Sequence, residues 1–272
     1  MTNLTDPITY LFVPADRPER YAKALASGAD RVIIDLEDAV TAKNKMAGRD
    51  AIKSADLDWS RIVIRINDSN SAHFEFDVSI LRQLPVRTIM VPKADGHTCL
   101  KRVDDALDNK RTLIPQIETV TSLFALPEIL SANNVDRVAF GHLDFALDLG
   151  SGTDQEALAY VRSQIVLHSR LAGKPRPIDS VTVDFRNREK TLEDALACKN
   201  LGFGGKLLIH PAQVDPVREA FLPSEEDIVW ARQVLRNLEK DGRGATSYQG
   251  QMIDHPVEMR AIQILALADK AK

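Results

Sequence analysis

RVIIDLEDAV (residues 31–40) places a short apolar run directly before a group of acids. Such a run is typical of a strand that is buried on both faces of a parallel sheet. Seven further runs share the form, an apolar stretch with polar residues at its end: YLFVPADRPER (10–20), RIVIRIN (61–67), TIMVPK (88–93), TLIPQIE (112–118), RVAFGHLD (137–144), IDSVTVD (178–184) and KLLIHP (206–211). The sequence therefore predicts eight buried strands, each with chemically active side chains where it ends.

Amphipathic stretches with helical spacing separate these strands. They cover residues 18–28, 42–55, 73–84, 97–109, 119–132, 154–173, 188–202 and 213–221. Strict alternation of strand and helix indicates a parallel sheet, and eight such units close a (β/α)8 barrel, the TIM-barrel fold. Pro127 is expected to kink or restart the helix that contains it.

The residues after the eighth helix exceed what a barrel needs. We assign residues 1–222 to the barrel and residues 223–272 to a C-terminal helical extension. Residues 224–242 predict a helix with Ser224 as its N-cap, residues 243–252 a glycine-containing loop, and residues 255–272 a last amphipathic helix. The apolar faces of these helices must pack on the barrel or on another subunit, and we favour another subunit.

Composition and charge exclude several classes of protein. The net charge of −4 gives no electrostatic reason to bind nucleic acid, and the apolar runs are too short to span a membrane. The first ten residues have no basic region before an apolar core, so we expect no signal peptide. Cys99 and Cys198 lie far apart without CxxC spacing, which favours two reduced thiols in a cytoplasmic protein.

Two carboxylates at the ends of neighbouring strands are the strongest candidates for a metal site. Glu118 ends the fifth predicted strand and Asp144 follows the sixth. Because the carboxyl ends of barrel strands converge on one rim, both side chains should face the same space. Two carboxylates with room for water and substrate oxygens suit Mg²⁺. The alternative, that both are helix caps or surface acids, stays open.

Arg65 ends the third predicted strand, where an unpaired arginine would be costly. Its planar fork could grip a substrate carboxylate, or it could form a structural ion pair with Glu37 or Asp38. Asp35 should be structural, since it points the same way as Glu37. Glu37 and Asp38 could orient metal-bound water.

Three further candidates are weaker. Lys93 follows the fourth strand and could form a Schiff base, although we favour this less. Lys206 lies at the other end of its strand, so a structural role is expected. His210 is expected to fix the loop before a helix, and no histidine spacing typical of a zinc site occurs.

Segments across nearly the whole chain carry a resemblance to a known family. They are LFVPADRPER, VIIDLEDAV, RIN, LIPQIET, AFGHLDFALDLG, VDFRN, LGFGGKLLIHPAQV and GQMIDHPVEMRAIQILALA. With them the chain resembles the citrate lyase β-subunit-like branch of the HpcH/HpaI aldolase family. The resemblance implies a (β/α)8 barrel, a homotrimer or a dimer of trimers, and Mg²⁺ as cofactor. It also implies cleavage or formation of a C–C bond beside a carboxylate, often in an acyl-CoA.

The resemblance also assigns roles to single residues. Glu118 and Asp144 fall on the family's metal ligands, and Arg65 falls on the arginine that holds the 2-oxo acid or its carboxylate. Asp254 falls on an acid that related CoA lyases place in the neighbouring subunit's site. Leu143 stands where the family often has an acid, a departure that bears on how metal-bound water is organised.

The resemblance places Phe12, Arg20 and Lys23 where relatives contact coenzyme A. We therefore expect a magnesium-dependent lyase that acts on a 3-hydroxyacyl-CoA of the citramalyl-, malyl- or citryl-CoA type. Alternatives are an aldolase for free 2-oxo acids without CoA, a synthase or thioesterase at the same site, and a metabolite-binding subunit without catalysis.

Overall fold

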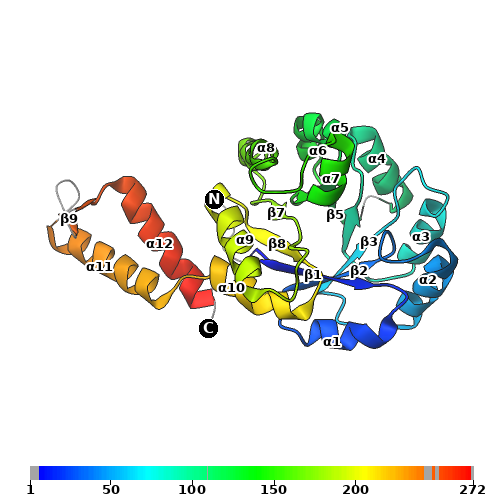
Figure 1. The fold of residues 1–272 in the computed structure, drawn as a ribbon, viewed down its shortest axis with the longest axis horizontal. Coiled ribbons are helices and arrows are strands. Elements are labelled where there is room, and N and C mark those ends of the chain that lie inside the picture. Colours follow the sequence, from blue (N-terminus) through cyan, green and yellow to red (C-terminus); the bar gives the residue numbers. More distant parts are fainter. Residues whose placement is uncertain (1–5, 109, 242–246, 249–250, 271–272) are drawn as a thin grey trace.

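Eight parallel strands close into a barrel in the computed structural model, which describes residues 6–108, 110–241, 247–248 and 251–270 (Figure 1). Each strand pairs with the next along the chain, and β1 closes the ring against β8. The TIM-barrel prediction is confirmed. The strands are β1 (Thr9–Pro14), β2 (Arg31–Asp35), β3 (Ile62–Arg65), β4 (Thr88–Val91), β5 (Thr112–Ile117), β6 (Ala139–Phe140), β7 (Ile178–Asp179) and β8 (Gly205–Leu208).

Helices surround the barrel and follow the strands in turn (Figure 1). They are α1 (Tyr21–Leu25), α2 (Lys45–Ser54), α3 (Phe74–Leu81), α4 (His97–Ala106), α5 (Val120–Phe124), α6 (Leu126–Ser131), α7 (His142–Leu149), α8 (Ala159–Leu171), α9 (Arg188–Leu201) and α10 (Val214–Phe221). Three short 3₁₀ segments join them: η1 (Pro18–Arg20), η2 (Ala42–Asn44) and η3 (Pro211–Gln213). The predicted interruption near Pro127 is confirmed, because α5 ends and α6 begins around Ala125.

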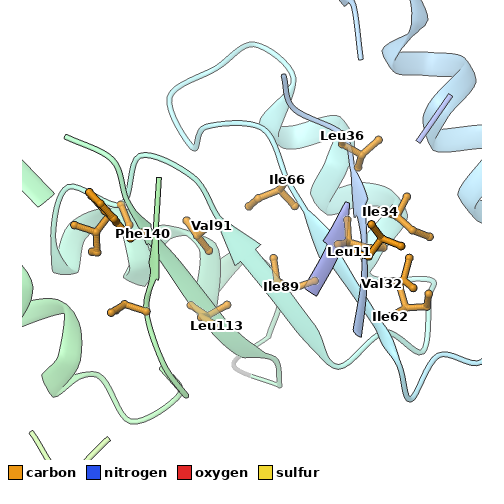
Figure 2. Packing of buried hydrophobic residues seen from close by; sticks show 14 of the residues in the cluster. Leu11, Val32, Ile34, Leu36, Ile62, Ile66, Ile89, Val91, Leu113 and Phe140 are labelled. Carbon is orange, nitrogen blue, oxygen red and sulfur yellow. The ribbon is translucent and has the colours of Figure 1, made fainter. Parts of the chain in front are cut away.

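Both faces of each strand are buried, as the continuous apolar runs predicted. Ile33, Val63 and Met90 belong to a cluster that fills the barrel interior. Their neighbours Val32, Ile34 and other residues pack outward in a larger cluster under the helices, part of which is shown in Figure 2. Because side chains alternate along a strand, every second residue points into the barrel. The polar residues that end the strands therefore lie next to a barrel interior that is filled with apolar side chains.

The rim after β5–β7 differs from the expectation. β6 and β7 have only two residues each, and the helix α7 that directly follows β6 was not predicted. Asp144 follows the sixth strand, as expected, and lies with His142 in the first turn of this helix. A one-residue turn at Gly141 joins β6 to α7, so this helix begins directly at the rim.

The C-terminal residues form a hairpin of two helices, α11 (Glu225–Asp241) and α12 (His255–Lys270), which projects away from the barrel (Figure 1). Ala231, Val234, Ile253 and Ala261 form an apolar cluster of its own. The predicted N-cap is confirmed, since Ser224 Oγ accepts from the Asp227 amide at 3.0 Å.

The predicted loop 243–252 lies partly outside the described residues. Its described parts pair as two short strands, β9 (Ser247–Tyr248) and β10 (Gln251–Met252). None of the helices in the described ranges has the length and apolar character needed to cross a membrane.

Candidate active site

Arg65 is locked in place at the carboxyl ends of the strands. Asp35, its register partner on β2, accepts from Nε at 2.7 Å and from Nη2 at 2.6 Å. The ring of Phe12 lies over the guanidinium, 4.7 Å from its centroid. The carboxylate of Asp35 also accepts from the amides of Glu37 and Ala39. Asp35 is thus structural, as expected, and it holds Arg65 in one orientation while some of the guanidinium N–H groups stay available.

Glu37 lies between two cations at this rim. Its Oε2 is 3.1 Å from Arg65 Nη1, and its Oε1 accepts from Lys93 Nζ at 2.7 Å. Burial raises the pKa of Glu37, and the charge of Arg65 opposes that rise. The structural ion pair considered for Arg65 therefore exists with Glu37, but its main partner is Asp35. Asp38, the other partner considered, is exposed.

Lys93 links Glu37 to Glu118. Its backbone amide donates to Glu118 Oε1 at 2.7 Å, and its φ of 47° is in the left-handed region that residues other than glycine seldom adopt. Although burial opposes its charge, the hydrogen bond and charge of Glu37 raise the pKa of Lys93. A protonated amine that is held by a carboxylate is a poor nucleophile, which argues against the Schiff-base role.

Glu118 is a buried carboxylate with one oxygen unused. The residue is 1% exposed, and Oε2 has no hydrogen-bond partner among the described residues. Burial, followed by the charge of Glu37, raises its pKa to about 8, and Asp144 adds to this rise. Asp144 is half-buried in the first turn of α7. The charge of Arg65 opposes the rise in the pKa of Glu118.

The donor set at Glu118 and Asp144 suits Mg²⁺. No group of three or more histidine, cysteine or acidic side chains in the described part of the chain could hold a metal by itself. Mg²⁺ is commonly bound through one or two carboxylates, with water and substrate oxygens completing its shell. The partnerless oxygen of Glu118 fits such an ion, because a cation there would offset the cost of a buried charge.

The remaining candidates lie outside this network. Arg20 and Lys23 are exposed on η1 and α1, which follow β1. Asp254 is exposed and caps α12, accepting from the Val257 amide at 3.1 Å. α12 begins at the end of the hairpin that is remote from the barrel (Figure 1). The fold thus brings together Arg65 and its neighbours but leaves Asp254 far from the rim of its own barrel.

Two expected structural roles are found. Lys206 is buried and donates to the carbonyl oxygen of Ser180 at 2.6 Å, with Asp179 Oδ2 at 3.4 Å. His210 Nδ1 accepts from the Ala212 amide at 3.1 Å and its ring stacks on Phe185. Neither residue belongs to the rim network.

Two contributors were missed by the sequence analysis. The amide of Lys93 acts through a backbone conformation that no sequence pattern signals. Gly141 packs directly on the acid, because a Cβ there would lie 2.8 Å from both Glu118 Oε2 and Gln116 Nε2. A glycine at the end of an apolar run, three residues before Asp144, was the available signal for the second.

The chain is similar to known proteins over most of its length. The family model described as HpcH/HpaI aldolase/citrate lyase matches residues 9–211. A citrate lyase subunit beta-like protein of Mycobacterium tuberculosis is 35% identical over 269 residues, covering 96% of each chain. The mitochondrial citramalyl-CoA lyase of Rattus norvegicus is 29% identical, covering 96% of this chain and 86% of the rat protein.

A solved structure extends the comparison to the whole fold. The CitE protein of Mycobacterium tuberculosis, in complex with magnesium, acetoacetate and coenzyme A, superposes with a TM-score of 0.88. It is 34% identical, and the match covers 98% of this chain and 100% of that protein. The likeness therefore includes the C-terminal hairpin as well as the barrel.

Proposed function

The chain belongs to the HpcH/HpaI aldolase/citrate lyase family, and we propose that it is a magnesium-dependent carbon–carbon lyase acting on a 3-hydroxyacyl-CoA. The substrate class is a thioester with a carboxylate on its hydroxylated carbon, as in citramalyl-, malyl- and citryl-CoA. The products are an acyl-CoA and a 2-oxo acid. The observation that carries the proposal is the buried network of Arg65, Glu37, Lys93 and Glu118 at the barrel rim.

Arg65 binds the substrate carboxylate in this proposal. Asp35 holds the guanidinium by two hydrogen bonds and Phe12 covers one of its faces, so the remaining N–H groups have a fixed direction. A fixed fork binds a carboxylate in one orientation and keeps the adjacent hydroxylated carbon in register for bond cleavage. Glu37 and Lys93 set the charge around this position.

Glu118 and Asp144 would hold the magnesium ion. When bound, Mg²⁺ supplies a Lewis acid for the substrate oxygen that becomes the ketone. The Lys93 amide fixes Oε1 of Glu118 and leaves Oε2 for the cation. Glu37 and Asp38 would orient water around this position.

Asp254 would serve the active site of a neighbouring subunit. Its place at the far end of a projecting hairpin supports this role, because the residue is remote from its own rim network. There it would donate a proton to the enolate carbon of the acyl-CoA that is formed when the C–C bond breaks. In the reverse direction it would act as the base. The active oligomer would be a homotrimer or a dimer of trimers.

Phe12, Arg20 and Lys23 would meet the coenzyme A moiety. Arg20 and Lys23 are exposed cations beyond the end of β1, which suits contact with phosphate groups. Phe12, on β1, precedes both residues along the chain, and its ring lies against the Arg65 guanidinium, at the boundary of the proposed acyl site.

The test is release of 2-oxo acid from citramalyl-, malyl- and citryl-CoA, with and without Mg²⁺. The proposal expects magnesium-dependent formation of pyruvate, glyoxylate or oxaloacetate from at least one thioester. Turnover that persists in chelator contradicts the metal role. Cleavage of free 2-hydroxy or 2-oxo acids at the same rate as their thioesters would instead support the aldolase without CoA.

A further inference from the structure

A cavity lies at the opposite end of the barrel from the rim network. It has a volume of about 490 Å³ and lies between the C-terminal ends of α8 and α9, with Gln263 of α12 on its border. Pro177 and Gly202, which precede β7 and β8, also line it. The cavity therefore opens on the amino ends of the strands and is separate from the proposed active site. Its volume is in the range of small-molecule sites.

The charged residues that line this cavity are all basic. They are Arg170, Lys174, Arg176 and Lys199. Lys174 donates to the carbonyl oxygens of Ala132 and Val135, and Lys199 donates to that of Ala220. The acceptors are neutral carbonyls, so within the described residues neither ammonium group forms a hydrogen bond or an ion pair with a carboxylate.

Arg170 and Arg176 have no partner in the described part of the chain. Neither side chain donates a hydrogen bond or forms an ion pair with any residue that the structure places. Burial lowers the pKa of Lys199; Asp227 opposes this effect, and the charges of Arg176 and Arg260 strengthen it. The border of the cavity therefore carries several positive charges and two free guanidinium groups, which suit bidentate binding of an oxyanion.

Ser169 provides an independent indication of a ligand. The residue lines the cavity and is 1% exposed, yet its hydroxyl oxygen is buried without a hydrogen-bond partner among the described residues. A buried hydroxyl without a partner is unfavourable, and an anion in the cavity would accept a hydrogen bond from it.

Neutralisation of helix dipoles explains only part of this arrangement. Arg170 and Lys199 lie in the last turns of α8 and α9, where cations stabilise a helix. Arg176 lies in the loop before β7 and belongs to no helix. Neither Arg176 nor the unpaired Ser169 hydroxyl follows from helix capping.

We propose that this cavity binds a small phosphate-bearing metabolite at the junction of barrel and hairpin. The phosphate would be held by the guanidinium groups of Arg170 and Arg176 and the hydroxyl of Ser169. Asn200 and Gln263 offer amide groups for the organic part of the ligand. Since Gln263 belongs to α12, a ligand bound here contacts both the barrel and the hairpin. The inference does not depend on the proposed lyase activity.

Isothermal titration of the full-length protein with inorganic phosphate, at constant ionic strength set by chloride, tests this site. We expect saturable binding to the wild-type chain and at least about tenfold weaker binding to Arg170→Gln and Arg176→Gln. Arg102→Gln removes an exposed arginine from α4 and serves as the matched control, with binding unchanged.

Two results would overturn the proposal. One is the absence of saturable phosphate binding to the wild-type chain. The other is binding that is equal in the wild-type, Arg170→Gln and Arg176→Gln proteins, because phosphate would then occupy a different place, such as the cations beyond β1. Both variants change exposed side chains, and circular dichroism verifies that they fold.

A comparison of phosphoglycerate with citrate distinguishes a phosphate site from a site for any polycarboxylate. Citrate binding as tight as that of phosphoglycerate would contradict the phosphate assignment.

Discussion

Arg65 depends on a partner that matches its shape. Both Asp35 oxygens bind the guanidinium, and Nη1 remains directed at Glu37. Lysine cannot reproduce this fork, because its ammonium group is a single point donor. Arg65→Lys is therefore expected to lower kcat/KM for the thioester by about 100-fold or more, chiefly by loss of carboxylate orientation.

Steady-state kinetics of Arg65→Lys and of the control Arg102→Lys measure this effect. The control exchanges an exposed arginine on α4 and should retain wild-type kinetics. A kcat/KM of Arg65→Lys within a factor of two of the wild-type value would contradict this prediction, because bidentate binding of the carboxylate would then contribute little to catalysis.

Gly141 allows Glu118 to occupy its position. Because a Cβ at Gly141 would lie 2.8 Å from Oε2, Gly141→Ala must displace the carboxylate or the start of α7. We expect Mg²⁺ affinity to fall by about tenfold or more and the free energy of unfolding to fall by about 1–3 kcal/mol.

Titration with Mg²⁺ and urea denaturation check the prediction for Gly141. The control is Gly150→Ala, which places its Cβ in open space at a positive φ and therefore adds backbone strain without touching Glu118. Equal loss of metal affinity in both variants would mean that strain in α7, and not contact with the carboxylate, sets the affinity.

The charged side chains of the candidate site could be chosen from the sequence because the strand ends of a barrel converge. Glu118, Arg65 and Glu37 follow from that rule alone. The pairing of Arg65 with Asp35 could not be predicted in this way, because several acids lie at the same strand end. The register of β2 against β3, in which Asp35 is opposite Arg65, selects one of them. The left-handed backbone of Lys93 is set by tertiary contacts and leaves no local trace.

Among the helices and strands, α7 has the most direct effect on the proposed site, because its first turn carries Asp144. Its first residue, His142, is buried and has Nδ1 2.5 Å from Ser180 Oγ, which joins α7 to the chain after β7. Burial, with the charge of Arg162 as a further cause, lowers the pKa of His142 to about 4. The folded protein therefore keeps this imidazole neutral at pH 7.

Acid should destabilise the protein through His142. The unfolded chain takes up a proton near the ordinary histidine pKa, whereas the folded chain does so only near pH 4. The stabilisation is thus complete above pH 6.5 and is lost as pH falls from 6.5 towards 4, by about 3 kcal/mol in total. His142→Asn should reduce the loss between pH 7 and pH 5, as measured by urea denaturation at each pH. An unchanged pH dependence in this variant would show that other groups cause it.

Strands and helices could be predicted from the sequence where the spacing of the apolar residues and the length of the segment indicate the same element. All eight strands lie in the predicted apolar segments, although β6 and β7 are only two residues long and the helix α7 was missed. The run AFGHLDFALDL continues the apolar character of β6 into α7, so no sequence boundary separates the strand from the helix except Gly141. Pro127 gave a clear local signal, and the chain breaks its helix there.

At the scale of the whole molecule, the hairpin has an apolar core of its own and carries Asp254 away from the barrel. If Asp254 completes a neighbour's site, two inactive variants should complement each other. Arg65→Ala and Asp254→Asn are each expected to be inactive, while mixed oligomers contain sites with an intact barrel and an intact neighbouring hairpin. Random assembly in equal amounts predicts about a quarter of wild-type activity.

Co-expression and purification of the mixed oligomers provides the measurement. The matched control mixes the Arg65→Ala and Glu118→Gln chains. Both residues act in the barrel of their own chain, so every site in this mixture lacks one of them. Activity in the control pair, or none in the Arg65→Ala and Asp254→Asn pair, would contradict a site shared between subunits.

The most direct test of the central claim is the rate of 2-oxo acid release from the best thioester by wild-type and Glu118→Gln proteins over a range of Mg²⁺ concentrations. The account predicts saturable activation by Mg²⁺ in the wild type and a loss of at least about 1,000-fold in the variant, with its fold and oligomeric state retained. Wild-type rates in Glu118→Gln, or rates independent of Mg²⁺ in either protein, would contradict the assignment of this rim as the magnesium-dependent lyase site.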